Sequence, residues 1–128
     1  MAFIAKIDAA ETATGKNIRI DERAMYNGKS ISSGDRIFIW TSETSGGCGL
    51  IAVGNVKSCT IIRGRVIAEV LVEATIRRQL NLSKIAPYRD VDDGSPESEL
   101  AQLIYRHAHN KVAALSETVR EFLEEHFL

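Results

Sequence analysis

The clearest fold signal in the chain is the stretch GDRIFIWTSETSGGCGLIAVGNV, residues 34–56. A turn-forming Gly-Asp pair precedes the run Arg36–Trp40, in which β-branched and aromatic residues favour a strand. A loop of hydroxyl-bearing residues and glycines follows, and Leu50–Val56 is then predicted to form the next strand. A glycine inside that second strand, Gly54, indicates a bulge or a close approach of another backbone segment. The stretch therefore predicts two strands joined by a polar, glycine-rich loop.

Period-two patterning predicts three further strands, Phe3–Ile7, Asn17–Ile20 and Val66–Ile76. In the last of these, the even-numbered positions are all apolar and β-branched residues dominate, which favours a strand. A helix remains the alternative there, with Glu69 and Glu73 on a solvated face. Between the second and third of these segments, Asp21 is predicted to cap a brief helix over residues 22–26.

The last third of the chain carries helix signals. Residues 79–94 lack periodicity and contain Pro87, so a connecting loop is expected there. Ser95-Pro96-Glu97 then combines a capping residue, a proline at the first helical position and an early acid, which predicts a helix start. That helix is expected to end near Asn110, and Ser116 is expected to cap a final helix.

Predicted strands therefore fill the first two thirds of the chain, and predicted helices fill the last third. This order is typical of an α+β fold, in which helices pack on one face or end of a sheet. We expect a small curled or closed, mainly antiparallel β-barrel with flanking helices, two of them C-terminal. The length predicts a single domain over residues 1–128.

Composition limits the function classes. The 128 residues carry a formal net charge of −1, whereas nucleic-acid-binding domains usually carry a basic excess, which argues against a large phosphate-tracking surface. No run approaches the roughly 20 apolar residues of a membrane span, and the first residues lack the apolar core of a signal peptide. We expect a cytoplasmic protein without membrane insertion, in which Cys48 and Cys59 are reduced; a bridge between them is the minor alternative. No zinc-ligand spacing is present, so no metal or other cofactor is expected.

The loop Thr41–Gly47 and the tryptophan before it form the first candidate site. Glycines let backbone N–H groups approach a ligand, and hydroxyls donate or accept hydrogen bonds. The loop has no phosphate-loop signature, and a plain hairpin loop is the alternative. By strand alternation, Ile37 and Ile39 face the core, which leaves Trp40 on the opposite face with Arg36. There, at the mouth of the loop, Trp40 is predicted to stack on a base, and burial in the core is the alternative.

A local basic run, residues 106–111, ends the penultimate helix. Arg106, His107 and Lys111 are the candidate phosphate contacts in it. The alternative is that these charges compensate the helix dipole on a solvated face. Nucleophilic catalysis has little support, because no GxSxG motif is present and neither cysteine has a histidine neighbour.

The opening stretch resembles a known family. Asn27–Ile31 followed by Gly34–Ser42 is similar to the signature of EVE domains, in which a Gly-Asp pair precedes an apolar strand, an aromatic residue and a hydroxyl. Gly49–Val56 and Val66–Leu82 resemble the following strands of that family and of its PUA-like relatives. Ser95–Leu115 resembles the tail of bacterial EVE-like proteins. The resemblance implies a PUA-like barrel with a pocket for a nucleobase, such as a methylated or hydroxymethylated cytosine.

The resemblance also implies a function and a site. The protein is expected to be a non-catalytic module that binds DNA or RNA carrying modified bases, as a monomer or weak homodimer. The resemblance implies Trp40 as the pocket aromatic with Thr41 and Ser42 beside it, and we expect Arg36 and Lys57 nearby as further ligand-binding residues.

Two other hypotheses remain open at this point. The related ASCH domains suggest a small hydrolase or ribonuclease, for which Lys57, Thr41 and Glu43 are the candidate residues. An accessory interaction module that uses the apolar end of the last helix is the third possibility.

Overall fold

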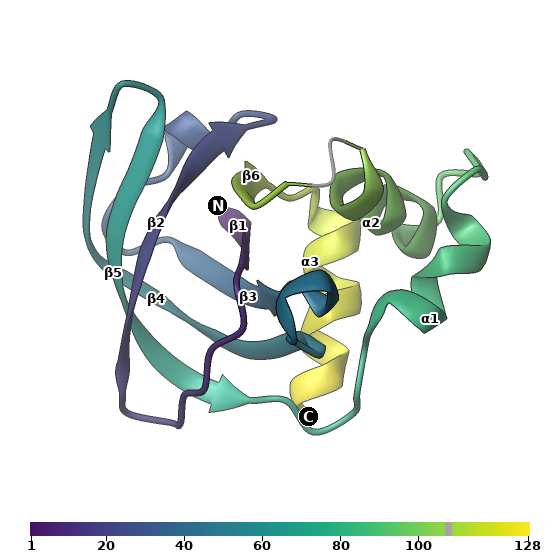
Figure 1. Cartoon of the computed structure of the whole chain (residues 1–128), viewed down its shortest axis with the longest axis horizontal. Helices are drawn as coiled ribbons and strands as arrows, with labels where there is room; N and C mark the ends of the chain where they lie inside the picture. Colours follow the sequence, from purple (N-terminus) through teal and green to yellow (C-terminus); the bar gives the residue numbers. More distant parts are fainter. Residues whose placement is uncertain (107–108) are drawn as a thin grey trace.

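The computed structural model describes residues 1–106 and 109–128. Strands close into a barrel on one side of the molecule, and the longer helices lie on the other (Figure 1). The strands are β1 (Ala2–Ile7), β2 (Asn17–Met25), β3 (Arg36–Thr41), β4 (Gly49–Ile62), β5 (Arg65–Thr75) and β6 (Lys111–Ala114). The α-helices are α1 (Leu82–Ile85), α2 (Pro96–Tyr105) and α3 (Glu117–Glu124). Short 3₁₀ turns are η1 (Gly28–Ser30), η2 (Glu43–Ser45), η3 (Ala86–Tyr88) and η4 (Glu125–Phe127).

The described strands form a closed barrel in the order β1-β3-β4-β5-β2-β6. Antiparallel pairing joins β1 to β6, β2 to β5, β3 to β4, and β4 to β5. Parallel pairing joins β1 to β3 and β2 to β6. The predicted α+β fold with a small, mainly antiparallel barrel and two C-terminal helices is thereby confirmed.

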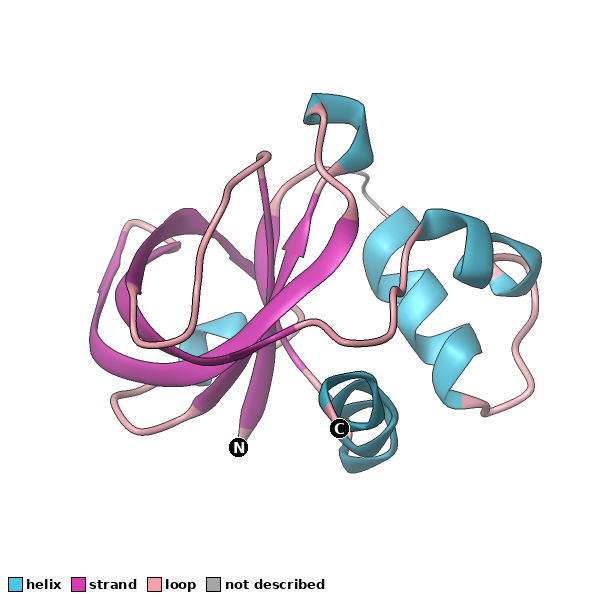
Figure 2. Ribbon diagram, turned by 90° about the horizontal axis from the view of Figure 1, so that it is seen from below, coloured by secondary structure: helices cyan, strands magenta, loops and turns pink. Residues whose placement is uncertain are grey.

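Two apolar clusters divide the core. One lies inside the barrel and draws only on strands and their connections, with Phe3, Ile37 and Ile39 among its fully buried members. The other lies between the outer face of the barrel and the helices, and it includes Phe38 and Trp40. Strand alternation therefore separates the isoleucines from the aromatic residues as the sequence predicted. Figure 2 shows α1, α2 and α3 together on one side of the barrel, which leaves the outer cluster beneath them.

The side chain of Arg36 joins α3 to this outer face. Its guanidinium donates to Glu124 of α3, with Nη2 3.0 Å from Oε2, and Nη1 lies 2.8 Å from Glu73 Oε2 on β5. These hydrogen bonds raise the pKa of Arg36 further above its usual range, the bond to Glu124 being the largest cause. Three elements are thus held by one partly buried cation, which gives Arg36 a structural role.

Both predicted helix starts are confirmed. Ser95 Oγ accepts a hydrogen bond from Ser98 N at 3.2 Å, with Pro96 at the first helical position. Ser116 Oγ accepts from Val119 N at 3.2 Å. These bonds satisfy backbone donors that the first turn of a helix leaves open. None of the described helices is both long and apolar enough to cross a membrane.

The brief helix predicted over residues 22–26 is wrong, because this segment continues β2. Residues 17–23 pair with β5, and Ala24 and Met25 then pair with β6. The partner strand β5 is long and offers a full ladder of hydrogen bonds. It covers nearly all of the segment for which a helix was the alternative, so the predicted strand is correct there. Pairing across the sheet thus overrides the local helical signal, as is common where propensity is weak.

Two predictions for the last third of the chain are also wrong. Helix α2 ends at Tyr105 instead of continuing to Asn110, and the short strand β6 follows it. With only four residues, β6 is too short to show a period of its own, yet it closes the barrel between β1 and β2. The region 79–94, predicted as a loop, contains α1 and η3.

Gly54 lies where β4 changes register against β5, and the predicted bulge and close backbone approach are both confirmed. A Cβ at this position would lie 2.2 Å from the carbonyl oxygen of Leu71.

We expect Gly54→Ala to reduce the free energy of unfolding by about 1–3 kcal/mol, because β5 must shift to accommodate the methyl group. Urea denaturation followed by circular dichroism measures this loss. Ser58→Ala, at an exposed position of the same strand, is the control; an equal effect of both substitutions would contradict the steric explanation.

Candidate functional site

A small pocket of about 100 Å³ lies where β1, β3 and the η2 turn meet α1 and α2. Its lining combines four polar side chains and four largely apolar ones: Lys6, Ser42, Glu43, Thr44, and Trp40, Leu82, Ile104, Tyr105. Pockets for drug-sized ligands are several times larger, on the order of 300–1,000 Å³. The cavity therefore suits one small, flat molecule with a few polar edges.

Trp40 reaches the cavity from the outer face of β3. It pairs with Lys6 of β1 on one side and with Leu50 of β4 on the other. Its side chain is 0% exposed, so the predicted position at an open loop mouth is wrong. Helix α2 and the segment before it cover this face, and Trp40 forms a wall of the cavity.

The indole N–H of Trp40 is buried and has no hydrogen-bond partner among the described residues. Buried polar groups in folded proteins are nearly always hydrogen-bonded, and leaving one unsatisfied costs about 1–3 kcal/mol. A bound molecule with an acceptor atom facing this wall would remove that cost. The indole N–H is thus an unsatisfied donor on a residue that lines the cavity.

Ser42 lies on a backbone that is held tightly. Its N–H donates to Ile7 O at 2.7 Å, and its carbonyl oxygen accepts from Gly47 N at 2.8 Å. A Cβ on Gly47 would lie 2.6 Å from the side chain of Thr41, so only glycine fits without displacing this turn. The Ser42 and Thr44 hydroxyl groups lie 2.8 Å apart and form a hydrogen bond at the cavity wall.

Glu43 connects this turn to the helical side of the cavity. Its Oε1 accepts a hydrogen bond from the backbone N–H of Leu82 at 3.1 Å. On the same side, the hydroxyl of Tyr105 lies 3.5 Å from the carbonyl oxygen of Leu82. The predicted polar loop is therefore a folded turn that is fixed to both neighbouring elements.

Thr41, a predicted ligand residue, does not line the cavity. Its hydroxyl accepts from Cys48 N at 3.0 Å and donates to Gly49 O at 3.1 Å. The side chain thus stabilises the base of the loop. Both cysteines of the chain are free thiols.

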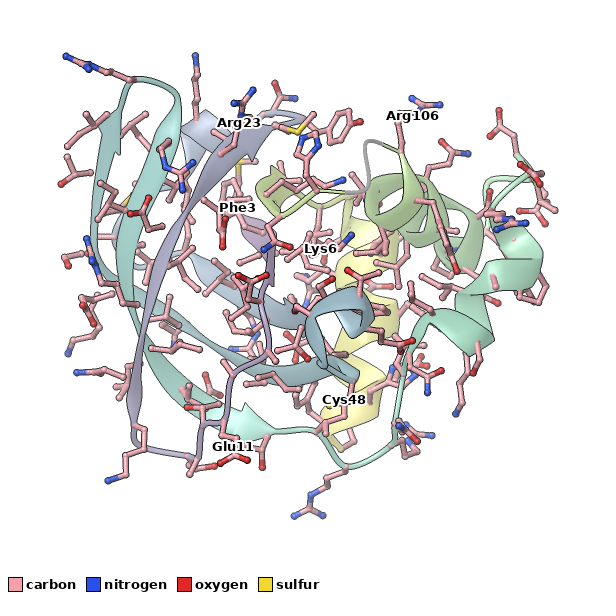
Figure 3. The ribbon with its side chains drawn as sticks, in the orientation of Figure 1. Phe3, Lys6, Glu11, Arg23, Cys48 and Arg106 are labelled. Carbon is pink, nitrogen blue, oxygen red and sulfur yellow. The ribbon has the colours of Figure 1, made fainter. Side chains whose placement is uncertain are left out.

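Two buried lysines lie next to each other beside the cavity. Lys6 on β1 and Lys111 on β6 are paired in register, and they are only 6% and 1% exposed. Lys6 Nζ lies 3.4 Å from Ile104 O, and Lys111 Nζ donates to Leu103 O and, at 2.8 Å, to Arg106 O. Figure 3 shows Lys6 between β1, the η2 turn and α2. Both ammonium groups therefore cap the C-terminal end of α2.

Burial shifts the titration of both amines. It lowers the pKa of Lys6. It also lowers the pKa of Lys111 to about 8, with the positive charge of Lys6 as the second cause. Desolvation of a cation and repulsion by a like charge act in the same direction here.

The structure does not bring Arg36 and Lys57 to the cavity. Arg36 pairs with Asn55 at the opposite end of the β3–β4 ladder from Trp40, and Lys57 lies two residues beyond Asn55. For the same reason, Lys57 is remote from Thr41 and Glu43, so the three residues named for a hydrolase do not form one site.

The three predicted phosphate contacts have different surroundings. Arg106 follows α2 and is exposed, and Figure 3 shows it pointing away from the barrel. The side chain of Lys111 lies on the outer face of β6, beneath α2. The helix covers this face, so the predicted contact of Lys111 with phosphate is wrong. His107 lies outside the described residues.

In the described parts of the chain, no three histidine, cysteine, aspartate or glutamate side chains lie close enough together to hold a metal ion.

Sequence reasoning missed Lys6, Leu82, Ile104 and Tyr105. For Lys6 a signal was present, because a lysine interrupts the otherwise apolar strand AFIAKI. Lysine is almost never buried unless it is paired. The helical residues carried no such signal, since they read as ordinary apolar positions.

The lowered pKa of Lys111 predicts how stability depends on pH. The unfolded chain keeps this amine protonated up to about pH 10.4, whereas the folded chain releases the proton at about pH 8. The unfolded state therefore binds more protons in this window, and the free energy of unfolding rises with pH, by up to about 3 kcal/mol. Urea unfolding at pH 8 and pH 10 measures the change.

Lys111→Met is the matched comparison. The raised pKa of the Cys59 thiol acts in the opposite direction and is present in both proteins. The wild-type protein should therefore gain more stability between the two pH values than the variant does. Equal changes would show that Lys111 titrates in the folded protein as it does in the unfolded chain.

The fold is similar to that of two solved structures. One is the crystal structure of human THYN1 protein in complex with DNA that contains 5-methylcytosine, with a TM-score of 0.69 and 10% sequence identity. It covers 97% of this chain and 95% of that chain. The other is the DUF55 domain of human thymocyte nuclear protein 1, with a TM-score of 0.61, 8% identity, and coverage of 98% and 97%.

No family model matches the sequence, and no curated protein matches it either. Sequence identities of 8–10% are too low to transfer a function, but the coverage of both chains is nearly complete. The chain therefore has the barrel fold of human THYN1.

Proposed function

We propose that the protein is a non-catalytic EVE-type reader, which binds a nucleic acid by taking a modified cytosine base into the cavity beside Trp40. The observation that carries the proposal is Trp40, which lines the cavity and whose buried indole N–H has no hydrogen-bond partner among the described residues. Human THYN1, which shares the fold, is in complex with DNA that contains 5-methylcytosine. We extend that ligand class to this chain.

The shape of the site supports an extruded base. Proteins that inspect a single base take it out of the stack and hold it between apolar and aromatic side chains. Here Leu82, Ile104 and the ring of Tyr105 supply apolar surface, and Trp40 supplies a further ring. The volume of about 100 Å³ admits a single small ring and excludes a stacked pair of bases.

The polar groups match the edge of a cytosine. The base offers a carbonyl oxygen and a ring nitrogen as acceptors and an amino group as donor. The Trp40 N–H can donate to an acceptor, and the hydroxyl groups of Ser42 and Thr44 can do so as well. Glu43, one of whose carboxylate oxygens already accepts from Leu82, has a second oxygen to accept from the amino group.

Few phosphate contacts accompany this pocket. The chain has a net charge of −1, and the exposed Arg106 beside the end of α2 remains a proposed contact, as does His107. Binding with so few contacts should depend only weakly on salt, because each phosphate neutralised adds about 0.9 to the slope of log K against log salt for duplex DNA. Base recognition then supplies most of the specificity.

Trp40→Phe tests the proposal, because it keeps an aromatic ring and removes the N–H. We expect wild-type protein to bind a fluorescein-labelled oligonucleotide with one 5-methylcytosine more tightly than the unmodified oligonucleotide. The variant should lose about 5–10-fold of affinity for the methylated oligonucleotide, equivalent to one hydrogen bond of ~1–1.5 kcal/mol. Fluorescence anisotropy titrations measure both affinities.

Phe38→Leu is the matched control, since Phe38 is buried on the same face of β3 but does not line the cavity. This variant should retain the preference for the methylated oligonucleotide. The same titrations with methylated RNA decide between the two nucleic acids. Equal affinity of the wild-type protein for methylated and unmodified oligonucleotides of both kinds would overturn the proposal.

A further inference from the structure

Burial separates the six lysines of the chain into two groups. The four exposed ones are Lys16, Lys29, Lys57 and Lys84. The two buried ones, Lys6 and Lys111, are neighbours in the β1–β6 ladder. Like charges directly opposite each other on adjacent strands are destabilising, and burial adds a desolvation cost. The chain therefore places two cations where a stable fold alone would avoid them.

Both lysines lie at the C-terminal end of α2, which carries the equivalent of about half a negative charge. Lys111 donates to Leu103 O and Arg106 O, and Lys6 Nζ lies 3.4 Å from Ile104 O. Of the two lysines, only Lys6 lines the cavity.

This arrangement activates an amine. A lysine becomes a nucleophile when burial or a second cation beside it favours the neutral form, and both conditions hold for Lys6. Burial lowers its pKa, and Lys111 is the neighbouring cation. A titrating group that is shifted by burial and lies in a cleft is a candidate for a functional site. A neutral amine in the wall of a base-sized cavity can react with a carbonyl carbon held there.

We propose that Lys6 forms a reversible covalent imine with a nucleobase that carries an aldehyde, such as 5-formylcytosine. This inference rests on the proposed function, because it requires that a base enter the cavity. The aldehyde takes the place of the methyl group of 5-methylcytosine, so the ring itself keeps the same size and the same polar edge. The site then retains an oxidised base covalently and a methylated base by hydrogen bonds and packing.

The chemical step needs no oxidant, reductant or metal. The neutral Nζ of Lys6 adds to the aldehyde carbon, and the carbinolamine loses water to form a C=N bond. Both hydrogens of the amine leave with the carbonyl oxygen as water, so aldehyde and amine give imine and one water. Loss of the hydroxyl group requires a proton, which the ammonium group of Lys111 can supply directly or through water. The reverse reaction releases the base unchanged.

The groups around Lys6 set its reactivity. Glu43 and Tyr105 line the same cavity, and Lys111 lies on the adjacent strand. Repulsion between the two ammonium groups lowers the pKa of Lys111, and because this repulsion is mutual, a charge on Lys111 disfavours the ammonium form of Lys6. Removing the charge at position 111 should therefore raise the proportion of protonated Lys6 and slow the reaction.

Reductive trapping tests the inference directly. Wild-type protein is incubated with 5-formyl-2′-deoxycytidine, or with an oligonucleotide that contains it, and sodium cyanoborohydride, which converts an imine into a stable amine. Intact mass spectrometry counts the adducts, and peptide mapping locates them. We expect a single adduct on Lys6 with both probes, at least tenfold more abundant than on any of the four exposed lysines.

Three variants make the result specific. Lys6→Arg keeps the charge but forms no such imine and should lose the adduct. Lys84→Arg, the control at an exposed lysine near the cavity wall, should leave the yield unchanged. Lys111→Met should reduce the trapping rate several-fold at pH 7.5, and the rate should approach that of wild-type protein as the pH is raised. Mapping of the wild-type adduct decides the question even if one of these variants fails to fold.

The outcomes separate this inference from the proposed function. Adducts spread over the exposed lysines, or no adduct on Lys6, would overturn the inference. If the same preparation still prefers the 5-methylcytosine oligonucleotide in anisotropy titrations, the reader function stands without the imine. If a Lys6 adduct forms with the nucleoside but the preparation shows no preference for methylated oligonucleotides, the imine chemistry stands and the reader function fails.

Discussion

The parallel pairing of β1 with β3 is the constraint on which the rest of the structure depends. It places Lys6 directly beside Trp40, although they are 34 positions apart in the sequence. The same strand β1 pairs with β6 on its other edge, which closes the barrel and brings Lys111 next to Lys6. A row of three side chains across three strands results, and it lies on the outer face, where α2 covers it. Two members of this row, Lys6 and Trp40, line the cavity.

Two kinds of cost are concentrated in that row. The indole N–H lacks a partner in the described structure, and two ammonium groups are buried as neighbours. Arg36, at the other end of β3, is by contrast paired with carboxylates of two other elements. Locally unfavourable arrangements that persist in a folded protein point to a functional site. The proposed base reader uses the indole N–H to recognise the edge of the ring. The proposed imine uses a buried amine to react with a substituent of the ring.

Local patterning was sufficient for much of the fold. Alternation assigned Ile37 and Ile39 to one side of β3 and Trp40 to the other, and the caps at Ser95 and Ser116 marked both long helices. Such signals depend only on neighbours in sequence. The barrel type followed from the resemblance of the strand after Gly34-Asp35 to EVE domains.

Other features depend on partners that are distant in sequence, and there the predictions were wrong. Burial of Trp40 depends on α2, which covers its face, and Arg36 is held by Glu124, 88 positions away. The role of Lys111 depends on β6, a strand of four residues that no periodic pattern reveals. The polar residue most closely tied to the cavity, Lys6, was visible as a single lysine in an apolar strand. A charged residue that breaks a strand pattern is thus a more useful site signal than a basic cluster on a surface.

In the proposed function, a modified base enters the cavity and accepts a hydrogen bond from Trp40. Because Trp40 is the only tryptophan in the chain, its indole N–H gives a single resonance in a ¹H–¹⁵N correlation spectrum. Titration with an oligonucleotide that contains 5-methylcytosine should move this resonance downfield, as expected when an unsatisfied N–H gains an acceptor, and the unmodified oligonucleotide should move it less. A resonance that stays in place while other residues report binding would contradict the account.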